Sequence, residues 1–363
     1  MLDAGQSRVT ADFYDLLPKV ELHCHVEGTI RPSTVVDLAR AAGRALPVDD
    51  PTELYRYTSL DSFLAVFWLV QELLRTPDDW ERAARESLVD AAPHGLRYRE
   101  MFFTPARHLA GGQDLAGIVA GLTRGIEAAE REVGVRAALI ADMDRSYGAA
   151  VGLELVEALV ALRRAGGAER VLGIGMDSTE LGVDLRAFAP ATRLAARHGL
   201  RVTAHAGEAV GVGADNIRVA LDDLGAERID HGIAVVDDAA LLRRMAAERV
   251  PLTVCPNSNI LIANRYPSLA DHPLAAMREA GLLATINTDD PAMTDLDLGR
   301  EYRSVAGALG FSDRAMADFA LDGIEGSWLD DADRRSLRST FDRDIAALLE
   351  QQPGGAAHGL RPS

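Results

Sequence analysis

Several residues that could bind a metal ion stand at the ends of short apolar runs in the sequence. His23 and His25 end the first run, His205 ends a later one, and Asp289 follows the last. Since residues i and i+2 of a strand face the same side, both imidazoles of the His-Cys-His segment can point to one ion. Three imidazoles and one carboxylate suit a catalytic zinc ion with an open position for water, although iron or another divalent ion would fit the same donors. We therefore expect one Zn²⁺-like ion per chain at these four residues.

Three further polar residues could act on protons or on a substrate near this ion. Glu208 follows the third histidine by three positions, where its carboxyl could pass protons to a substrate ring nitrogen or could simply begin the next helix. His231 ends another apolar run and could hold or deprotonate the attacking water, or could be a satisfied core histidine. Asp290 adjoins Asp289, and successive strand residues point to opposite sides. The Asp-Pro pair there indicates a turn, which would let one carboxyl bind the ion and the other contact the substrate.

These residues need a fold that brings strand ends together. Eight short apolar runs alternate with longer segments of helical spacing. This alternation predicts an α/β fold, a (β/α)₈ TIM barrel, in which side chains at the carboxyl ends of the strands converge on one mouth. An open doubly wound sheet would also satisfy the alternation. The predicted strands are Lys19–His23, Leu96–Phe103, Arg136–Asp142, Val171–Asp177, Leu200–His205, Arg228–His231, Pro251–Cys255 and Leu283–Asn287.

The segment between the first two predicted strands is unusually long. It carries Phe63, Phe67 and Trp68, and we interpret it as extra helices that cover the barrel mouth, because long insertions in compact domains are often lids. No linker composition interrupts the chain, so we expect a single domain over residues 1–350. Residues 351–363 are rich in glycine and proline and are expected to form a disordered tail.

Composition limits the partners and the compartment. The chain has 363 residues and a formal net charge of −17, which disfavours nucleic acid as a partner because phosphate backbones are repelled. Its two cysteines, Cys24 and Cys255, form no disulfide framework, and no signal-peptide pattern is found, so we expect a cytoplasmic protein. No apolar run is long enough to span a membrane. The charged, alanine-rich helix faces suit a monomer or a homodimer.

Five short motifs, in the order expected of barrel strand ends, resemble those of the adenosine/adenine deaminase family of the metal-dependent amidohydrolase superfamily. The resemblance runs from about Leu17 to about Leu349. It implies a zinc-dependent hydrolase that replaces the 6-amino group of a purine nucleoside or base by attack of a metal-activated water on C6. The motifs are Pro18-Lys-Val-Glu-Leu-His-Cys-His, His205-Ala-Gly-Glu, Asp230-His-Gly, Leu252-Thr-Val-Cys-Pro-Asn-Ser-Asn and Asn287-Thr-Asp-Asp-Pro-Ala.

The resemblance also implies a role for each site residue. The zinc ligands would be His23, His25, His205 and Asp289. Glu208 would protonate purine N1, His231 would orient the attacking water, and Asp290 would engage N7. Motifs of other enzyme classes, such as GxSxG, GxxxxGK[ST] and GxGxxG, are absent from the sequence.

Two positions depart from the nucleoside branch of that family. Glu27 stands where adenosine deaminases have an aspartate near the ribose, and Ser178-Thr179-Glu180 replaces a Gly-Asp-Glu whose glycine contacts purine N3. Free-base adenine deaminases resemble this chain more closely at both positions. In the last two of the five motifs, however, their usual sequences differ from that of this chain. We expect Glu27, Ser178 and Asp290 to contact the substrate, and leave open adenosine, adenine and a larger nucleoside such as aminodeoxyfutalosine.

Two other classes of function remain to be weighed against deamination. The same metal-activated water could hydrolyse an ester or lactone, a reaction that does not require the acid at Glu208. A non-enzymatic purine-binding protein on a decayed barrel is disfavoured, because no ligand or proton carrier of the site is missing.

Overall fold

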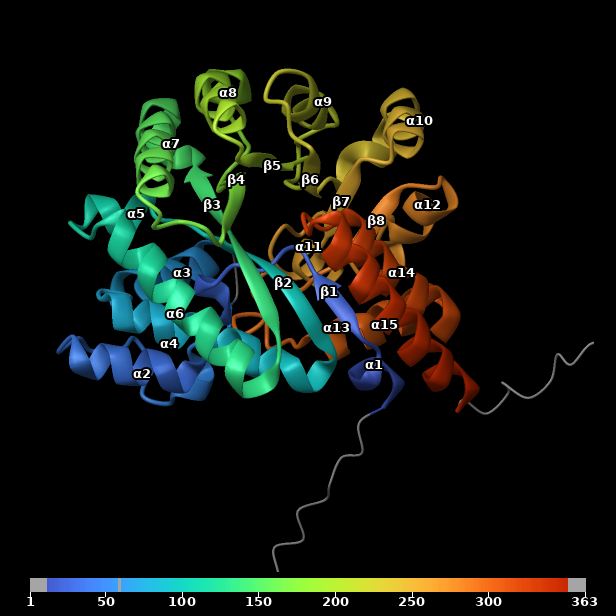
Figure 1. Ribbon diagram of the computed structural model, residues 1–363, viewed down its shortest axis with the longest axis horizontal. Coiled ribbons are helices and arrows are strands. Elements are labelled where there is room, and N and C mark those ends of the chain that lie inside the picture. Colours follow the sequence, from blue (N-terminus) through green and yellow to red (C-terminus); the bar gives the residue numbers. More distant parts are fainter. Residues whose placement is uncertain (1–11, 58–59, 352–363) are drawn as a thin grey trace, which may run out of the picture.

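Eight parallel strands form one sheet whose order follows the chain from β1 to β8 (Figure 1). The computed structural model describes residues 12–57 and 60–351. Three of the strands have the predicted bounds, and the others differ by one or two residues at an end. The strands are β1 (Lys19–Glu21), β2 (Leu96–Phe103), β3 (Arg136–Asp144), β4 (Val171–Asp177), β5 (Arg201–Ala206), β6 (Arg228–His231), β7 (Pro251–Val254) and β8 (Leu283–Ile286).

The ring closes between the last strand and the first, just beyond their carboxyl ends. Cys24 and Asp289 form a parallel bridge, in which the His25 amide donates to the Asp289 carbonyl at 2.9 Å. The Asp289 amide donates in turn to the His23 carbonyl at 3.2 Å. This closure decides between the two folds that the alternation allowed: the predicted (β/α)₈ barrel is confirmed and an open sheet is excluded. It also places His23, His25 and Asp289 at the seam.

Helices surround the strands on the outside of the barrel (Figure 1). Each packs an apolar face inward, as α6 does with Leu122, Ile126 and Ala129 at helical spacing. Two glycines let α6 approach its neighbour α4 closely: a Cβ on Gly121 or Gly125 would lie 2.1 or 2.3 Å from an α4 carbonyl oxygen. The helices that follow the strands are α6 (Leu115–Val133), α7 (Gly148–Arg164), α8 (Ala189–Arg197), α9 (Asp215–Asp222), α10 (Ala239–Glu248), α12 (Leu274–Glu279), α13 (Leu298–Leu309), α14 (Asp313–Gly326) and α15 (Asp331–Glu350).

The insertion between β1 and β2 contains the extra helices that the sequence predicted. They are the short helix η1 (Glu27–Thr29), α2 (Pro32–Ala41), η2 (Pro51–Glu53), α3 (Leu60–Leu73), α4 (Pro77–Ala91) and η3 (Ala92–His94). Of these, α3 packs on η1 and on α5 (Ala106–Ala110), the elements directly past β1 and β2, so it borders the mouth. In contrast, α4 packs along α6.

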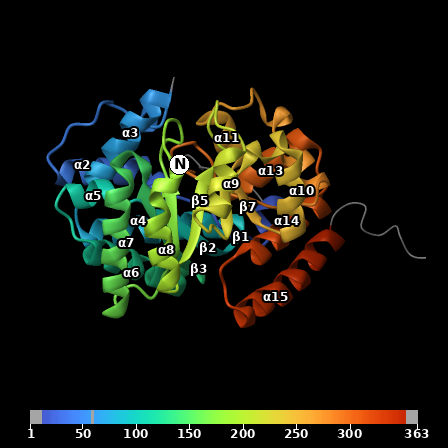
Figure 2. The same ribbon diagram turned by 90° about the horizontal axis from the view of Figure 1, so that it is seen from above.

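The two ends of the barrel can be told apart in a second view. Figure 2 shows α3 and α11 (Pro256–Leu261) at one edge of the molecule and α15 at the opposite edge. Within residues 12–57 and 60–351, no helix is both long enough and apolar enough to cross a membrane. Apart from residue 351, the expected disordered tail lies outside the described residues.

Candidate active site

The predicted ligand set comes together at the barrel mouth. One ligand atom from each of His23, His25, His205 and Asp289 lies within 4.8 Å of the other three, and all four residues are buried. Asp289 Oδ1 lies 3.2 Å from His23 Nε2 and 3.4 Å from His25 Nε2. The Nε2 atoms of His25 and His205 are 3.2 Å apart. Residues from β1, β5 and β8 thus converge as the sequence predicted.

The donor atoms of this set fit a divalent cation. Nδ1 of His25 faces a carboxylate of Asp142 at 3.7 Å, and Nδ1 of His205 faces Asp230 at 3.6 Å, which favours the tautomer with the proton on Nδ1. The two facing Nε2 atoms then carry lone pairs, which repel each other unless a cation lies between them. Burial lowers the pKa of His25 to about 3 and the pKa of His205 well below its usual value, so both imidazoles are neutral, as metal ligands must be.

Asp230 supports two of the candidate ligands from behind. Its carboxylate oxygens lie 3.9 Å from His23 Nδ1 and 3.6 Å from His205 Nδ1, and they accept hydrogen bonds from the Thr203 and Thr253 hydroxyls at 2.8 and 2.9 Å. Thr253 also lies 3.0 Å from His23 Nδ1. Such outer contacts fix the orientation of ligating imidazoles.

Asp142 stands behind His25 and was not predicted as a site residue. It is fully buried, and neither of its carboxylate oxygens has a hydrogen-bond partner within the described chain. Burial, together with the nearby Asp177, raises the pKa of Asp142 well above its usual value. Gly175 on the neighbouring strand β4 leaves room for this carboxyl, because a Cβ on Gly175 would lie 2.0 Å from Asp142 Oδ1. The sequence places Asp142 at the end of the third predicted strand, but it does not show that the Asp142 side chain points into the barrel.

Three site residues adopt the left-handed backbone conformation that residues with a Cβ rarely take. The φ angles are 72° at Ser178, 58° at His231 and 65° at Asp289. Each such residue costs about 1–3 kcal/mol, and clusters of them mark functional sites. At Asp289 the unusual φ resolves the expected conflict between neighbouring aspartates, since both Asp289 and Asp290 are buried there. Gly28 faces Asp290 closely, because a Cβ there would lie 1.9 Å from Asp290 Oδ1.

Glu208 lies in a loop, so the structure rejects the alternative that it begins a helix. The loop is held by Glu180, a buried carboxylate that accepts from the Gly207 and Glu208 amides at 2.8 Å each and from the Asn216 side chain at 2.9 Å. Glu208 Oε2 lies 3.6 Å from His231 Nε2. Burial raises the pKa of Glu208, which favours the protonated form of its carboxyl.

His231 is oriented by a chain of polar contacts rather than isolated in the core. Its Nδ1 lies 3.0 Å from Asn259 Nδ2, and Asn259 Oδ1 lies 3.2 Å from His272 Nε2. The other ring nitrogen, Nε2, is free to face Glu208 and lies 4.0 Å from Asp289 Oδ2. The imidazole therefore turns one nitrogen to the supporting chain and the other to the site.

The helix that follows β7, α11, is held by a buried glutamate that sequence reasoning missed. Glu301 on α13 accepts from the amide and the side chain of Asn257 at 3.2 and 2.8 Å. The next residue, Ser258, donates its hydroxyl to Asp289 Oδ2 at 2.6 Å. Burial raises the pKa of Glu301 to about 8. Glu301 and Glu180 each hold a segment that follows a barrel strand by accepting hydrogen bonds from it. Neither set of hydrogen bonds can be inferred from a single sequence.

The three residues expected to contact substrate differ in where they lie. Glu27 is fully buried, accepts from the Thr104 amide at 2.9 Å through Oε1, and leaves Oε2 without a partner among the described residues. Burial raises the pKa of Glu27 to about 7. Asp290 is also buried, and burial with the neighbouring Asp289 raises its pKa well above the usual value. Ser178, in contrast, is exposed, and its carbonyl accepts from Arg145.

Comparison with known proteins agrees with this geometry. The sequence model of the family described as adenosine deaminase matches residues 18–344. Among curated relatives, an adenine deaminase of Streptomyces coelicolor is 39% identical over 91% of this chain and 95% of that protein. An adenosine deaminase of Salmonella typhi is 36% identical over 89% and 97%. A solved amidohydrolase from Burkholderia ambifaria with bound zinc superposes with a TM-score of 0.86 at 30% identity, over 94% of this chain and 96% of that one. The chain belongs to the adenosine deaminase family of metal-dependent hydrolases.

Proposed function

We propose that this protein hydrolyses the 6-amino group of a purine, with free adenine as its preferred substrate and zinc as its metal. The observation that carries the proposal is the buried set of three imidazoles and one carboxylate, flanked by Glu208 and His231 on one side and by Asp290 on the other. Hydrolysis of an ester or lactone would need the metal set alone, whereas this site adds an acid and a second carboxyl with raised pKa values.

The metal is proposed to be zinc because of the donors that would hold it. His23, His25, His205 and Asp289 supply three borderline nitrogen donors and one oxygen, the set that zinc prefers when one position stays open. The related amidohydrolase with bound zinc supports this choice. When bound, such an ion lowers the pKa of a water molecule and stabilises negative charge that develops on oxygen.

Glu208 and His231 are proposed to move and hold protons on either side of the reacting carbon. The carboxyl of Glu208, whose pKa is raised by burial, donates to purine N1 as water attacks C6, which makes the ring carbon a better electrophile. His231 presents Nε2 toward the same space; because its Nδ1 accepts from the Asn259 side-chain amide, Nε2 carries the ring proton and donates a hydrogen bond that holds the attacking oxygen in place. The proton that the attacking water loses is passed to the departing amine as ammonia forms.

Asp290 is proposed to hold the five-membered ring of the purine. N7 of adenine is an acceptor, so its partner must donate a hydrogen bond. The Asp290 Oδ1 atom is buried and has no partner within residues 12–57 and 60–351, and the raised pKa favours the protonated, donating form. Asp290 would therefore orient the ring so that C6 faces the metal set.

Adenine is favoured over nucleosides because the carboxyl of Glu27 fills buried space beside the site. Glu27 is one methylene longer than the aspartate of the nucleoside branch, is fully buried, and reaches across to the Thr104 amide. Asp177 reaches the same residue, accepting from the Thr104 hydroxyl at 2.5 Å. These two carboxyls, joined through one threonine, leave less room for a ribose than for a hydrogen at N9. The 39% identical adenine deaminase supports this choice.

A substrate panel tests the proposal. Zinc-loaded protein is supplied with adenine, adenosine, deoxyadenosine, N6-methyladenine and aminodeoxyfutalosine, and ammonia release and ultraviolet absorbance are followed. We expect the largest kcat/KM for adenine, and no turnover by the matched variant Glu208→Gln, which should still bind metal. Glu27→Asp should raise kcat/KM for adenosine relative to adenine. The deaminase proposal fails if the wild-type protein leaves every 6-aminopurine unchanged, and the preference fails if adenosine is the better substrate.

A further inference from the structure

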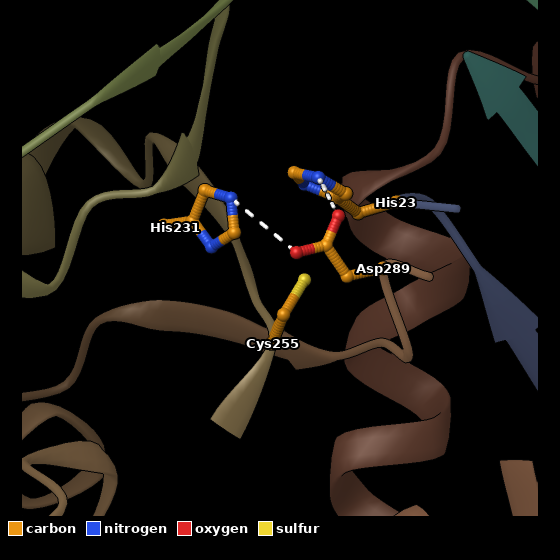
Figure 3. Close-up of side chains that lie close together, drawn as sticks. All are labelled: His23, His231, Cys255 and Asp289. Atoms are coloured by element: carbon orange, nitrogen blue, oxygen red, sulfur yellow. Dashed lines mark ion pairs between the residues drawn. The ribbon is translucent and has the colours of Figure 1, made fainter. Parts of the chain in front are cut away.

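The barrel mouth offers a second set of four donors, which overlaps the first. His23, His231, Cys255 and Asp289 each present one ligand atom, and these atoms lie within 4.8 Å of one another (Figure 3). All four residues are buried. The set keeps two members of the candidate zinc site but replaces His25 and His205 with a different imidazole and a thiol. A cation there would be held from β1, β6, β7 and β8 rather than from β1, β5 and β8.

The carboxylate of Asp289 faces both sets, one with each oxygen. Oδ1 lies 3.2 Å from His23 Nε2 and 3.4 Å from His25 Nε2, on the side of the candidate zinc site. Oδ2 lies 4.0 Å from His231 Nε2 and accepts from the Ser258 hydroxyl at 2.6 Å. Figure 3 shows the two oxygens directed to His23 and His231 respectively. His23 and Asp289 belong to both sets. The two sets therefore cannot each hold an ion with all four donors at the same time.

Cys255 is the member that distinguishes the second set. Its thiol is fully buried, and the one hydrogen bond described for it is a weak donation to the Thr253 carbonyl at 3.7 Å, which leaves the sulfur lone pairs available. In Figure 3 the sulfur lies beside the Asp289 carboxylate. The other cysteine, Cys24, is equally buried but belongs to no donor cluster found in the described part of the chain. Cys24 therefore provides a matched control.

A thiolate changes which ions a site prefers. Two imidazoles, one carboxylate and one thiolate form a four-donor set in which sulfur selects soft ions, whereas the all-nitrogen-and-oxygen set has no such preference. We propose that the mouth contains a second, overlapping cation position at His23, His231, Cys255 and Asp289, which takes thiophilic ions such as Cd²⁺ and inhibits the enzyme when filled. Inhibition rests on the proposed function, since an ion there occupies the nitrogen of His231 that faces the attacking water.

The binding step balances without any change of oxidation state. A metal–sulfur bond forms, the Cys255 thiol loses its proton to solvent, the His231 proton moves from Nε2 to Nδ1 as Nε2 binds the ion, and the zinc ion is expelled because its ligands His23 and Asp289 are taken. A coordinated thiol is deprotonated by the charge of the bound ion, even where burial otherwise disfavours the thiolate. Three quantities therefore change together: sulfur-to-metal absorption, one released proton, and zinc content.

The experiment adds Cd²⁺ to zinc-loaded wild-type protein and to the variants Cys255→Ser and Cys24→Ser. Binding is followed by the ultraviolet thiolate-to-cadmium absorption band, by proton release against a pH indicator, and by metal content after gel filtration. We expect wild type and Cys24→Ser to gain the band and to lose zinc and activity in step with it. Cys255→Ser should gain no band, release one proton fewer per ion, and keep its activity at the same Cd²⁺ concentration.

Two results would overturn the proposal. One is exchange of zinc for cadmium in wild type without a sulfur band, and the other is equal inhibition of Cys255→Ser. Either would mean that cadmium substitutes at the zinc ligands alone. If the serine variant does not fold, Cys255→Ala serves in its place, with circular dichroism and zinc content as checks. The absorption and metal measurements need no turnover, so they test this position even if the proposed deaminase activity is absent.

Discussion

Buried charges are treated differently at the two ends of the barrel. Toward the amino end, Arg228 lies 2.5 Å from Glu100 Oε2, and its guanidinium lies 4.2 Å from the centroid of the Trp328 ring. Lys19, fully buried at the start of β1, donates to the carbonyls of Tyr14, Leu17 and His94. Each of these cations faces an opposite charge or a ring of acceptors, although Nε and Nη2 of Arg228 make no hydrogen bond within the described residues. We call this set of residues the floor.

At the mouth, buried carboxyls are left without such partners. Glu27, Asp142, Asp177 and Asp290 each have at least one carboxylate oxygen with no hydrogen-bond partner in the described residues. Burial is the largest cause of the raised pKa of every one of them. The mouth also carries the strained φ angles at Ser178, His231 and Asp289.

The comparison shows which buried charged groups stabilise the fold and which reduce its stability. A buried charge that has lost its partner destabilises a fold by several kcal/mol, so groups left unpaired must be retained for another reason. At the mouth that reason is an external partner, either a cation or a substrate that donates and accepts hydrogen bonds. Substitutions should therefore separate cleanly: floor variants should lose stability, and mouth variants should lose binding or turnover.

The largest effect is expected at the residue that both donor sets share. Asp289→Ala removes the only carboxylate of the candidate zinc set, so tight metal binding and all measurable turnover should be lost together. The metal-free variant should unfold at a somewhat lower temperature than the metal-free wild type, because alanine tolerates the φ of 65° less well than aspartate and the carboxylate's contacts with His23 and Ser258 are lost. Metal content by mass spectrometry checks the first statement and calorimetry the second. Retained stoichiometric zinc would contradict the assignment.

The next largest effect is expected at the floor. Glu100→Gln removes the nearer of the two carboxylates beside the buried Arg228 guanidinium, whose Nε also lies 3.9 Å from Asp230 Oδ1, and removing one partner of a buried pair typically costs about 3–5 kcal/mol. The free energy of unfolding in urea should fall by that amount. Metal affinity and the kcat/KM of the folded fraction should not change. A variant that unfolds like wild type, or that loses metal first, would show that the floor and the mouth are not separate.

A smaller effect is expected from Asp142, which faces His25 from behind. Asp142→Asn keeps the shape but removes the charge, and loss of such an outer partner typically weakens metal binding about 10–100-fold. The metal-free variant should be more stable than wild type at neutral pH, since the unfolded chain releases the Asp142 proton there, whereas the native protein, in which the pKa of Asp142 is raised, holds that proton against the solution pH. Chelator competition measures the affinity and urea titration the stability. Unchanged zinc affinity would remove Asp142 from the site.

Much of the barrel and the metal set could be predicted from the sequence, because both follow from local patterns. The apolar runs predicted the strand ends to within two residues. The polar residues at those ends included all four ligands of the candidate zinc set. His231 and Glu208 were identified too, but with alternatives that only the structure could remove. For Glu208, the deciding fact is Glu180, which lies 28 residues away in sequence and holds the loop by three hydrogen bonds to backbone amides.

The residues that were missed all act through distant partners. Nothing near Asp142 in the sequence shows that its side chain points inward against Gly175. Nor does the sequence show that Glu301, on α13, holds the segment that follows β7. Ser178 is expected to contact substrate; its side chain is exposed, and its carbonyl accepts a hydrogen bond from Arg145. Single-sequence patterns report which strand end a residue occupies, but not its φ angle or its partner across the barrel.

The last effect is gradual, because it is spread over several pH units, and it tests whether the floor is as well satisfied as the geometry suggests. Burial lowers the pKa of Lys19 to about 7 in the folded state, against an ordinary value of 10.5. Between these two pH values the unfolded chain binds a proton that the native protein does not, so the free energy of unfolding should rise with pH, by at most about 1.4 kcal/mol per pH unit. Lys19→Met should lack this rise, and the difference between the two proteins in urea unfolding from pH 6 to pH 10 isolates it. If the two curves stay parallel, the carbonyls of Tyr14, Leu17 and His94 keep the ammonium charged, and the floor is better satisfied than burial alone implies.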